Sequence, residues 1–108
     1  MFKVTVLYHH PKDTQQFEEY YSQKHLPVAR QMPELSKVEL TKFESGPGAA
    51  KPAYYRMAEL YFHAKKTMEE TMGSPEGQAT IDDLANFATG GVTILLGDVE
   101  ETTASKNF

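Results

Sequence analysis

The sequence has no cysteine. This absence excludes disulfide bonds, thiolate nucleophiles and cysteine-ligated zinc, and it fits a reducing cytoplasm. Long apolar runs are absent as well, since no stretch approaches the ~20 residues that a membrane-spanning helix needs. Lys3 interrupts the apolar start of the chain, so we expect no signal peptide. The sequence therefore predicts a cytoplasmic protein without a membrane partner.

Positive charge is scarce. Eleven Lys and Arg residues stand against fifteen Asp and Glu residues, which gives a net charge of −4. The basic residues are scattered, and the densest pair, Lys65–Lys66, is typical of a solvated helix face. Because no basic cluster offers a footprint for phosphates, we predict no nucleic-acid partner.

The motifs of several site classes are also missing. The four histidines do not show the HxH or HxxxH spacing of metal sites, and there is no Ser-x-Gly nucleophile elbow. The glycines at 46, 48, 90 and 91 do not form a phosphate-binding loop followed by a helix. We therefore predict no metal and no cofactor.

The length of 108 residues fits one domain, which we expect over 1–100, followed by a polar, flexible tail over 101–108. With 40% hydrophobic residues the chain can build one core. A domain this small buries a limited share of its surface, so a partner subunit would add stability.

Hydrophobic periodicity predicts strands over 2–8, 35–44, 54–62 and 92–99. A helix is expected to begin at the N-cap Asp13, to kink or restart near His25–Leu26 because of Pro27, and to end by Pro33. Two further helices are expected, one over 64–72 and one that begins at Ser74 and ends at Gly90–Gly91. We expect the second strand to point Val38, Leu40 and Phe43 inward, and the last helix to bury Ile81, Leu84, Ala85 and Phe87.

This order is the split β-α-β-β-α-β pattern of an α+β, ferredoxin-like fold with a four-stranded antiparallel sheet. The helices are expected to cover one face of the sheet. The other face has many large apolar side chains, which favours a second copy of the chain packed against it. Two such sheets would enclose a barrel-like interior.

The stretch 17–29 has an aromatic helix face that runs into Tyr-x-x-x-His-x-Pro, formed by Tyr21, His25 and Pro27. This stretch resembles the signature of EthD-like proteins. The strand over 4–8, the turn over 11–13 and the segment 81–84 are similar to that family too. The resemblance covers nearly the whole chain, although its sharp element is the Tyr/His/Pro constellation.

The resemblance implies a dimeric α/β-barrel protein. The family is named for a protein encoded with an ether-degrading oxygenase system. Its members are similar in fold to muconolactone isomerases and small antibiotic-biosynthesis monooxygenases, which use the space between sheet and helices as a small-molecule pocket. The resemblance thus implies a homodimer that binds a hydrophobic small molecule in a degradation or biosynthetic pathway.

His25 is the first candidate for chemistry, because a neutral imidazole can accept or donate a proton near pH 7. Tyr21, one helical turn earlier, lies on the same helix face and is expected to share a hydrogen-bond network with it. The alternative is that His25 only caps backbone groups at the helix break. The expected ligand-binding residues are Tyr8, Pro27, Tyr55 and Tyr61, for which packing in the core or in a dimer interface is the alternative.

Three functions are open from the sequence. The first is an enzyme of proton-transfer type, which catalyses isomerisation, dehydration or cofactor-free oxidation with His25 as general acid/base. The second is a non-catalytic carrier or accessory protein for an oxygenase system. The third is a purely structural dimer whose interior is filled by side chains.

Overall fold

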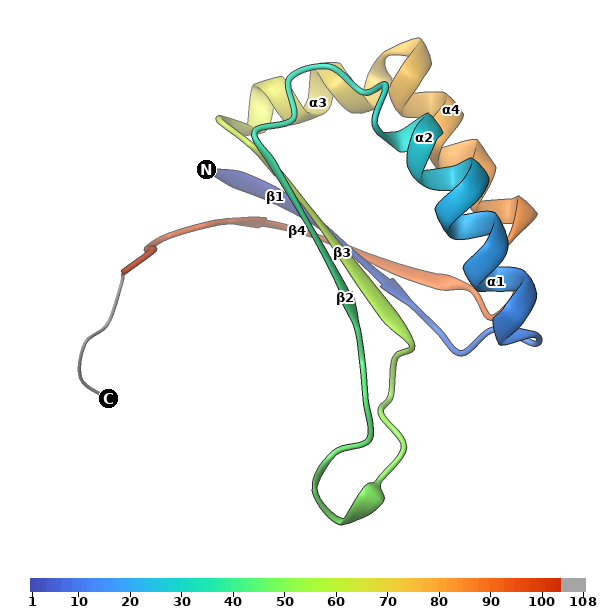
Figure 1. Cartoon of the computed structure of the whole chain (residues 1–108). Coiled ribbons are helices and arrows are strands. Elements are labelled where there is room, and N and C mark those ends of the chain that lie inside the picture. Colours follow the sequence, from blue (N-terminus) through green and yellow to red (C-terminus); the bar gives the residue numbers. More distant parts are fainter. Residues whose placement is uncertain (104–108) are drawn as a thin grey trace.

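The protein folds into one antiparallel four-stranded sheet with its helices on a single face, as a computed structural model of residues 1–103 shows (Figure 1). The strands are β1 (Phe2–Tyr8), β2 (Lys37–Lys42), β3 (Arg56–Phe62) and β4 (Val92–Asp98), and their order in the sheet is β2-β3-β1-β4. Every neighbouring pair is antiparallel. The predicted α+β, ferredoxin-like fold is confirmed.

The helices form two groups along the chain. The first runs without interruption through α1 (Thr14–Tyr20), the π-helical turn η1 (Tyr21–His25) and α2 (Leu26–Ala29). The second contains α3 (Lys65–Gly73), α4 (Pro75–Asp83) and the short 3-10 helix η3 (Leu84–Asn86). A further 3-10 turn, η2 (Pro47–Ala49), lies in the long β2–β3 hairpin loop. The hairpin itself agrees with the expectation that no helix separates these strands.

Local signals explain where the helices begin. Asp13 caps α1, because its Oδ1 accepts a hydrogen bond from the backbone N–H of Gln16 at 3.0 Å. Ser74 caps α4 in the same way by accepting from the N–H of Gly77. Both caps satisfy backbone donors that a helix N-terminus leaves without partners.

The core lies between the sheet and the helices. Alternate residues of β1 are buried there, together with alternate residues of β3 and an aromatic cluster from the helices. The four largest fully buried side chains are Tyr8, Phe17, Phe62 and Val4.

Two predictions about the core need correction. Val38 and Leu40 of β2 do lie on the helix side of the sheet, opposite Leu60 and Ala58, but they are 41% and 39% exposed on this edge strand. Ile81 of α4 is not buried either, with 37% exposed.

The packing of α4 is set by its small residues instead of by an apolar stripe. Gly77 and Thr80 are its buried residues, while Ala85, which follows in η3, is exposed. A Cβ atom at Gly77 would collide with the carbonyl oxygen of Thr71 and with the backbone of Met72. The absence of a side chain at Gly77 therefore lets α3 and α4 meet closely.

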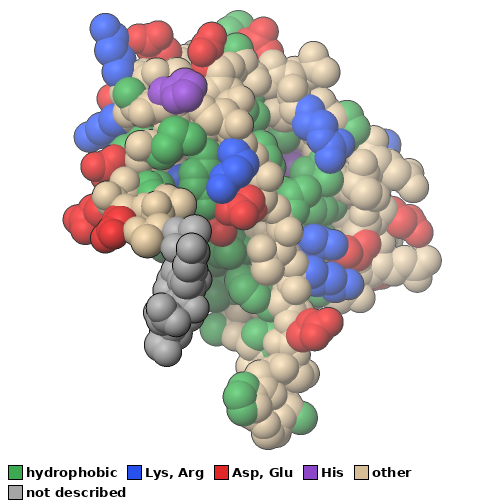
Figure 2. All heavy atoms as spheres, turned by 60° about the vertical axis from the view of Figure 1, so that its left-hand side comes forward, with side chains coloured by type: hydrophobic (Ala, Val, Ile, Leu, Met, Phe, Trp, Pro, Cys, Tyr) green, Lys and Arg blue, Asp and Glu red, His purple; other side chains and the backbone are tan. Residues whose placement is uncertain are grey.

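The sheet face turned away from the helices is more mixed than the sequence suggested. Leu7, Met57 and Leu95 lie on it, but they are interspersed with charged side chains such as Lys3 and Glu59, which form an ion pair of 2.6 Å. Figure 2 shows green apolar patches broken by blue and red side chains on this side of the molecule. Three of the most exposed large apolar residues are on edge strand β4, where Leu95 lies on this face and Ile94 and Leu96 lie on the helix side.

The predicted tail falls partly outside the described residues, which exclude 104–108. Residues 101–103 are exposed and have no regular secondary structure. Within 1–103, the structure contains no helix that has both the length and the apolar character to traverse a bilayer.

Candidate functional site

A cavity of about 280 Å³ lies between the sheet and the first helical group. Its wall comes from β1, β2 and β3 on one side and from η1, α2 and α4 on the other. The lining residues are Val6, Tyr8, Tyr21, His25, Leu26, Ala29, Arg30, Leu35, Val38, Leu40, Ala58, Leu60 and Thr80. Most of this wall is aliphatic, as is typical of a pocket for an apolar small molecule.

The π-helical turn η1 places the polar side chains of this wall. The backbone N–H of Leu26 donates to the carbonyl of Tyr21, five residues earlier. The next residue is Pro27, which has no N–H and whose ring clashes with the carbonyl four residues earlier in a regular α-helix. The predicted break near His25–Leu26 is thus a widened turn within a continuous helix, a feature that is frequent at functional sites.

His25 is buried, with 4% of its surface exposed, and is held from several sides. Its Nδ1 lies 2.9 Å from Oδ2 of Asp83 at the end of α4. The ring packs against Phe87, with 4.5 Å between centroids, and stacks on Tyr21 at 5.9 Å. The imidazole therefore has one fixed orientation against the cavity.

Asp83 is itself clamped by two further donors. The hydroxyl of Tyr20 donates to its Oδ1 at 2.6 Å, and Nδ2 of Asn86 donates to the same oxygen at 2.9 Å. Burial alone would raise the pKa of Asp83, but the hydrogen bonds from Tyr20, Asn86 and His25 hold that pKa below its ordinary value. Asp83 is thus a carboxylate at neutral pH, and it accepts the Nδ1 proton of His25.

Burial lowers the pKa of His25, and the hydrogen bond and charge of Asp83 oppose this effect only in part. The ring is therefore neutral at pH 7. Because Nδ1 carries the proton that is donated to Asp83, Nε2 carries the lone pair. Within residues 1–103, Nε2 has no hydrogen-bond partner. The arrangement is that of a proton acceptor supported by a carboxylate.

Tyr21 supplies the second polar group of the site. Its hydroxyl is buried and is without a hydrogen-bond partner in the described part of the chain. Burial raises the pKa of Tyr21 to about 12, so the hydroxyl stays protonated. The guanidinium of Arg56 lies 5.0 Å from the centre of its ring and is bound in turn by Glu18 through hydrogen bonds of 2.8 and 2.6 Å.

The structure brings together three of the six predicted site residues. His25, Tyr21 and Tyr8 all line the cavity, and the rings of Tyr8 and Tyr21 meet edge to face at 5.5 Å. Pro27 is exposed and does not line the cavity. It affects the site indirectly, because it disfavours a regular α-helical turn before it.

Tyr55 and Tyr61 do not reach the cavity. Tyr55 precedes β3, which begins at Arg56, and its ring packs against Phe17 at 5.2 Å. Tyr61 lies on the opposite face of the sheet, where its hydroxyl donates to Glu39 at 2.7 Å. The two tyrosines were expected on one face of a longer strand, and the later start of β3 separates them.

Sequence reasoning missed Asp83, Tyr20 and Asn86, which set the protonation of His25. The one available signal was the acid pair at 82–83, which follows the exposed Ile81 at the end of a predicted helix. Within the described residues, no three His, Asp or Glu side chains are grouped so that they could hold a metal ion.

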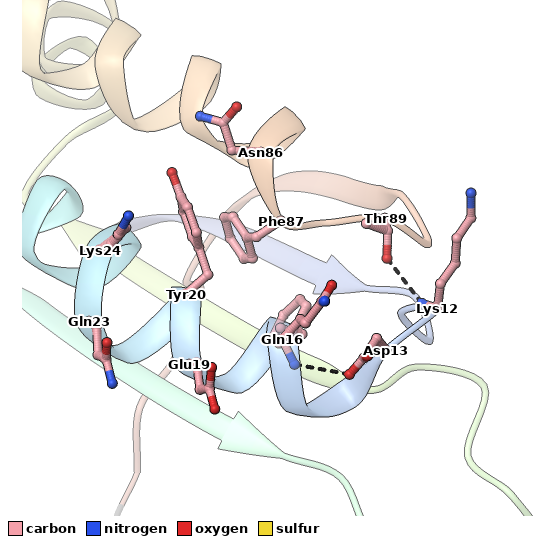
Figure 3. Close-up of a pocket in the computed structure, with 11 residues that line it drawn as sticks. Lys12, Asp13, Gln16, Glu19, Tyr20, Gln23, Lys24, Asn86, Phe87 and Thr89 are labelled. Carbon is pink, nitrogen blue, oxygen red and sulfur yellow. Dashed lines mark hydrogen bonds between the residues drawn. The ribbon is translucent and has the colours of Figure 1, made fainter.

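A second, more open depression lies on the outer side of the same network and has a volume of about 470 Å³. Figure 3 shows Tyr20 reaching from α1 toward η3, with its ring beside that of Phe87. The two rings stack at 5.4 Å. Polar side chains, among them Lys12, Lys24 and Asn86, surround this depression. The side chains of Tyr20 and Phe87 thus separate the outer depression from His25.

Comparison with known proteins identifies close relatives. The model of the EthD domain family matches residues 9–91. An uncharacterised 11.0 kDa protein of Rhodococcus erythropolis, from the thcB–thcC intergenic region, is 43% identical over 100 residues, which are 93% of this chain and 96% of that protein. The crystal structure of an EthD family protein from Bacillus halodurans is 30% identical, has a TM-score of 0.84, and aligns over 92% of this chain and 98% of its own.

More distant structures share the fold alone. One is SnoaB, a cofactor-independent oxygenase from Streptomyces nogalater, with 12% identity and a TM-score of 0.67 over 96% of each chain. Another is a dimeric protein with a ferredoxin-like fold from Bacteroides fragilis, with 14% identity and a TM-score of 0.64 over 91% of this chain and 95% of its own. Proteins with this fold thus include dimers.

Proposed function

The chain belongs to the EthD family, and from this premise and the geometry of the cavity we propose that it binds an apolar small molecule between sheet and helices and catalyses proton transfer on it. The observation that carries the proposal is the bond of 2.9 Å between Nδ1 of His25 and Asp83. This bond leaves the lone pair of Nε2 as the base at a largely aliphatic cavity.

In this mechanism, His25 removes a proton from a C–H or O–H group of the bound molecule. Asp83 stabilises the imidazolium that forms, and it stays ionised because Tyr20 and Asn86 donate to it. The proton then returns to another atom of the same molecule, so an isomerisation needs no further reactant. The protonated hydroxyl of Tyr21 is the donor for an oxygen that gains negative charge.

Isomerisation, dehydration and cofactor-free oxidation all begin with such a deprotonation. SnoaB, which shares the fold, is described as a cofactor-independent oxygenase and supports the last of these. The family name, which refers to an ether, supports a role in a degradation or biosynthetic pathway such as ether degradation. A cytoplasmic location belongs to the same proposal and rests on the cysteine-free sequence.

A homodimer is part of the proposal. Ile94, Leu95 and Leu96 on edge strand β4 are among the most exposed apolar residues. Leu95 lies on the sheet face turned away from the helices, and Ile94 and Leu96 lie on the helix side of the strand. A second copy would cover them, in line with the small size of the domain. Sedimentation at micromolar concentration should give the mass of a dimer, and a stable monomer would contradict this part of the proposal.

Native mass spectrometry of the purified protein, with mild extraction of any bound compound, tests the function first. The extracted compound is then incubated in D₂O with the protein, and its deuterium content is measured. We expect exchange of an acidic proton with the wild type and with the His63→Gln control, which alters an exposed histidine. With His25→Gln, we expect binding without exchange.

The outcomes separate the candidate functions. Equal exchange with wild type and His25→Gln would remove His25 from the mechanism. If the compound binds but takes up deuterium with neither the wild type nor His25→Gln, the non-catalytic carrier is favoured. A carrier needs the aliphatic wall but no base. If no apolar compound is bound or accepted, the structural dimer is favoured.

A further inference from the structure

The wall of the cavity carries a single formal charge. Of its thirteen lining residues, none is Asp, Glu or Lys, and one is Arg. His25 is neutral because burial lowers its pKa, and Tyr21 keeps its proton because burial raises its pKa. Among the described residues, Arg30 is therefore the one formally charged group on the wall.

In the described part of the chain, Arg30 has no counter-ion. Within residues 1–103, no carboxylate lies within 4.0 Å of its guanidinium, and its side chain makes no hydrogen bond. By contrast, the guanidinium of Arg56 donates hydrogen bonds to both carboxylate oxygens of Glu18. Arg30 is exposed and follows α2, so it stands at the mouth of the cavity. Its backbone N–H donates to the carbonyl of Leu26 at 2.9 Å and fixes its place there.

An unpaired guanidinium at the mouth of an aliphatic cavity selects a ligand by charge. We propose that the ligand is a carboxylate with a short apolar body, with its carboxylate bound by Arg30 and its body against Val38, Leu40 and Leu60. This inference rests on the proposed function, because it names the class of molecule that occupies the same cavity. A guanidinium binds a planar carboxylate through two parallel hydrogen bonds.

The same wall argues against other anions and against cations. A phosphate monoester carries more charge than one arginine neutralises, and no lysine lines the cavity. An amine would face Arg30 as a like charge and would find no acidic partner on the wall. The volume of about 280 Å³ is sufficient for an apolar body of one or two rings or a short chain.

Binding of matched probes tests the ligand class. Hexanoate and phenylacetate are titrated against hexanamide and phenylacetamide, which have the same body without the charge. Methyl signals of Val38, Leu40 and Leu60 in NMR spectra report occupation of the cavity. The variants are Arg30→Gln and the control Lys24→Gln, which also removes one positive charge but lies in the outer depression.

We expect the wild type and Lys24→Gln to bind each carboxylate roughly tenfold more tightly than its amide, as a charge-assisted hydrogen-bonded pair contributes. In Arg30→Gln this preference should disappear, while the affinity for the amides stays the same. Equal affinity for carboxylate and amide in the wild type would overturn the inference and leave cavity binding intact. If none of the four probes shifts the methyl signals, cavity binding itself fails, and the proposed function fails with it.

Discussion

The Asp83→Asn substitution tests whether the carboxylate sets the protonation of His25. In the wild type, Oδ2 of Asp83 accepts the Nδ1 proton at 2.9 Å, and Oδ1 is occupied by Tyr20 and Asn86. An asparagine keeps the shape of the side chain but has one acceptor oxygen and no charge. The imidazolium form of His25 therefore loses its counter-charge, and the Nδ1–H tautomer loses its fixed acceptor.

The magnitude follows from the lost interaction. A hydrogen bond to a charged group contributes about 1.5–3 kcal/mol, and one pKa unit corresponds to about 1.4 kcal/mol. Since Asp83 raises the pKa of His25 against the effect of burial, the substitution should lower that pKa further. The free energy of unfolding should fall by about 2–3 kcal/mol, because His25, Tyr20 and Asn86 lose a charged acceptor.

Long-range ¹H–¹⁵N NMR spectra of ¹⁵N-histidine-labelled protein read Nδ1 and Nε2 separately. Spectra from about pH 4 to pH 8 give both the tautomer and the midpoint of the titration. The matched control is Asp82→Asn, which alters the preceding residue, an exposed carboxylate. The reasoning is refuted if wild-type His25 carries its proton on Nε2, or if His25 titrates alike in the two variants.

Three other substitutions give distinct results. Gly77→Ala should lower the free energy of unfolding by about 2–3 kcal/mol, measured by urea denaturation, because its Cβ would collide with the backbone of α3. The control Gly73→Ala has open space around its Cβ and should be neutral or stabilising. Tyr21→Phe should leave the stability of the ligand-free protein unchanged or raise it, because the lost hydroxyl has no partner in the described chain; a clear loss in calorimetry would mean that it has one. Burial lowers the pKa of His25 in the folded protein below its unfolded value of about 6.5. The stability of the protein should therefore fall as the pH drops below the unfolded pKa. In thermal melts, His25→Gln should weaken this pH dependence and His63→Gln should leave it unchanged.

The parts of the fold that depend on neighbouring residues could be predicted from the sequence. Alternation of side chains identified all four strands, and Asp13 and Ser74 marked the helices that they cap. These signals are local, because a cap and the backbone N–H that it binds lie three residues apart. Pro27 likewise indicated an irregular helix near His25, although not that the irregularity is a π-helical turn.

The parts that depend on tertiary packing could not be predicted. Of the predicted helix stripe, Phe87 is buried and Leu84 packs against the core, but Ile81 is exposed because the close contact of Gly77 with α3 decides which face of α4 is buried. Tyr61 was assigned to the pocket because alternation tells which residues share a sheet face, but not which face the helices cover. The partner of His25 is 58 residues away in the sequence, so no spacing rule could indicate Asp83.

The irregular turn and the acid–base site are two aspects of one feature. In an α-helix, side chains five residues apart point roughly 140° apart, so they do not reach a common partner. Tyr20 and His25 are five residues apart, yet both bind the carboxylate of Asp83, through its Oδ1 and Oδ2 respectively. The π-helical turn between them has a hydrogen bond over five residues, from Leu26 to Tyr21, and this wider turn brings the two side chains to the same side. Pro27 disfavours the regular alternative, since a proline there clashes with an α-helical carbonyl. The Tyr-x-x-x-His-x-Pro pattern thus has a physical reason: its proline favours the turn that allows a carboxylate on α4 to hold the histidine with Nε2 free to accept a proton.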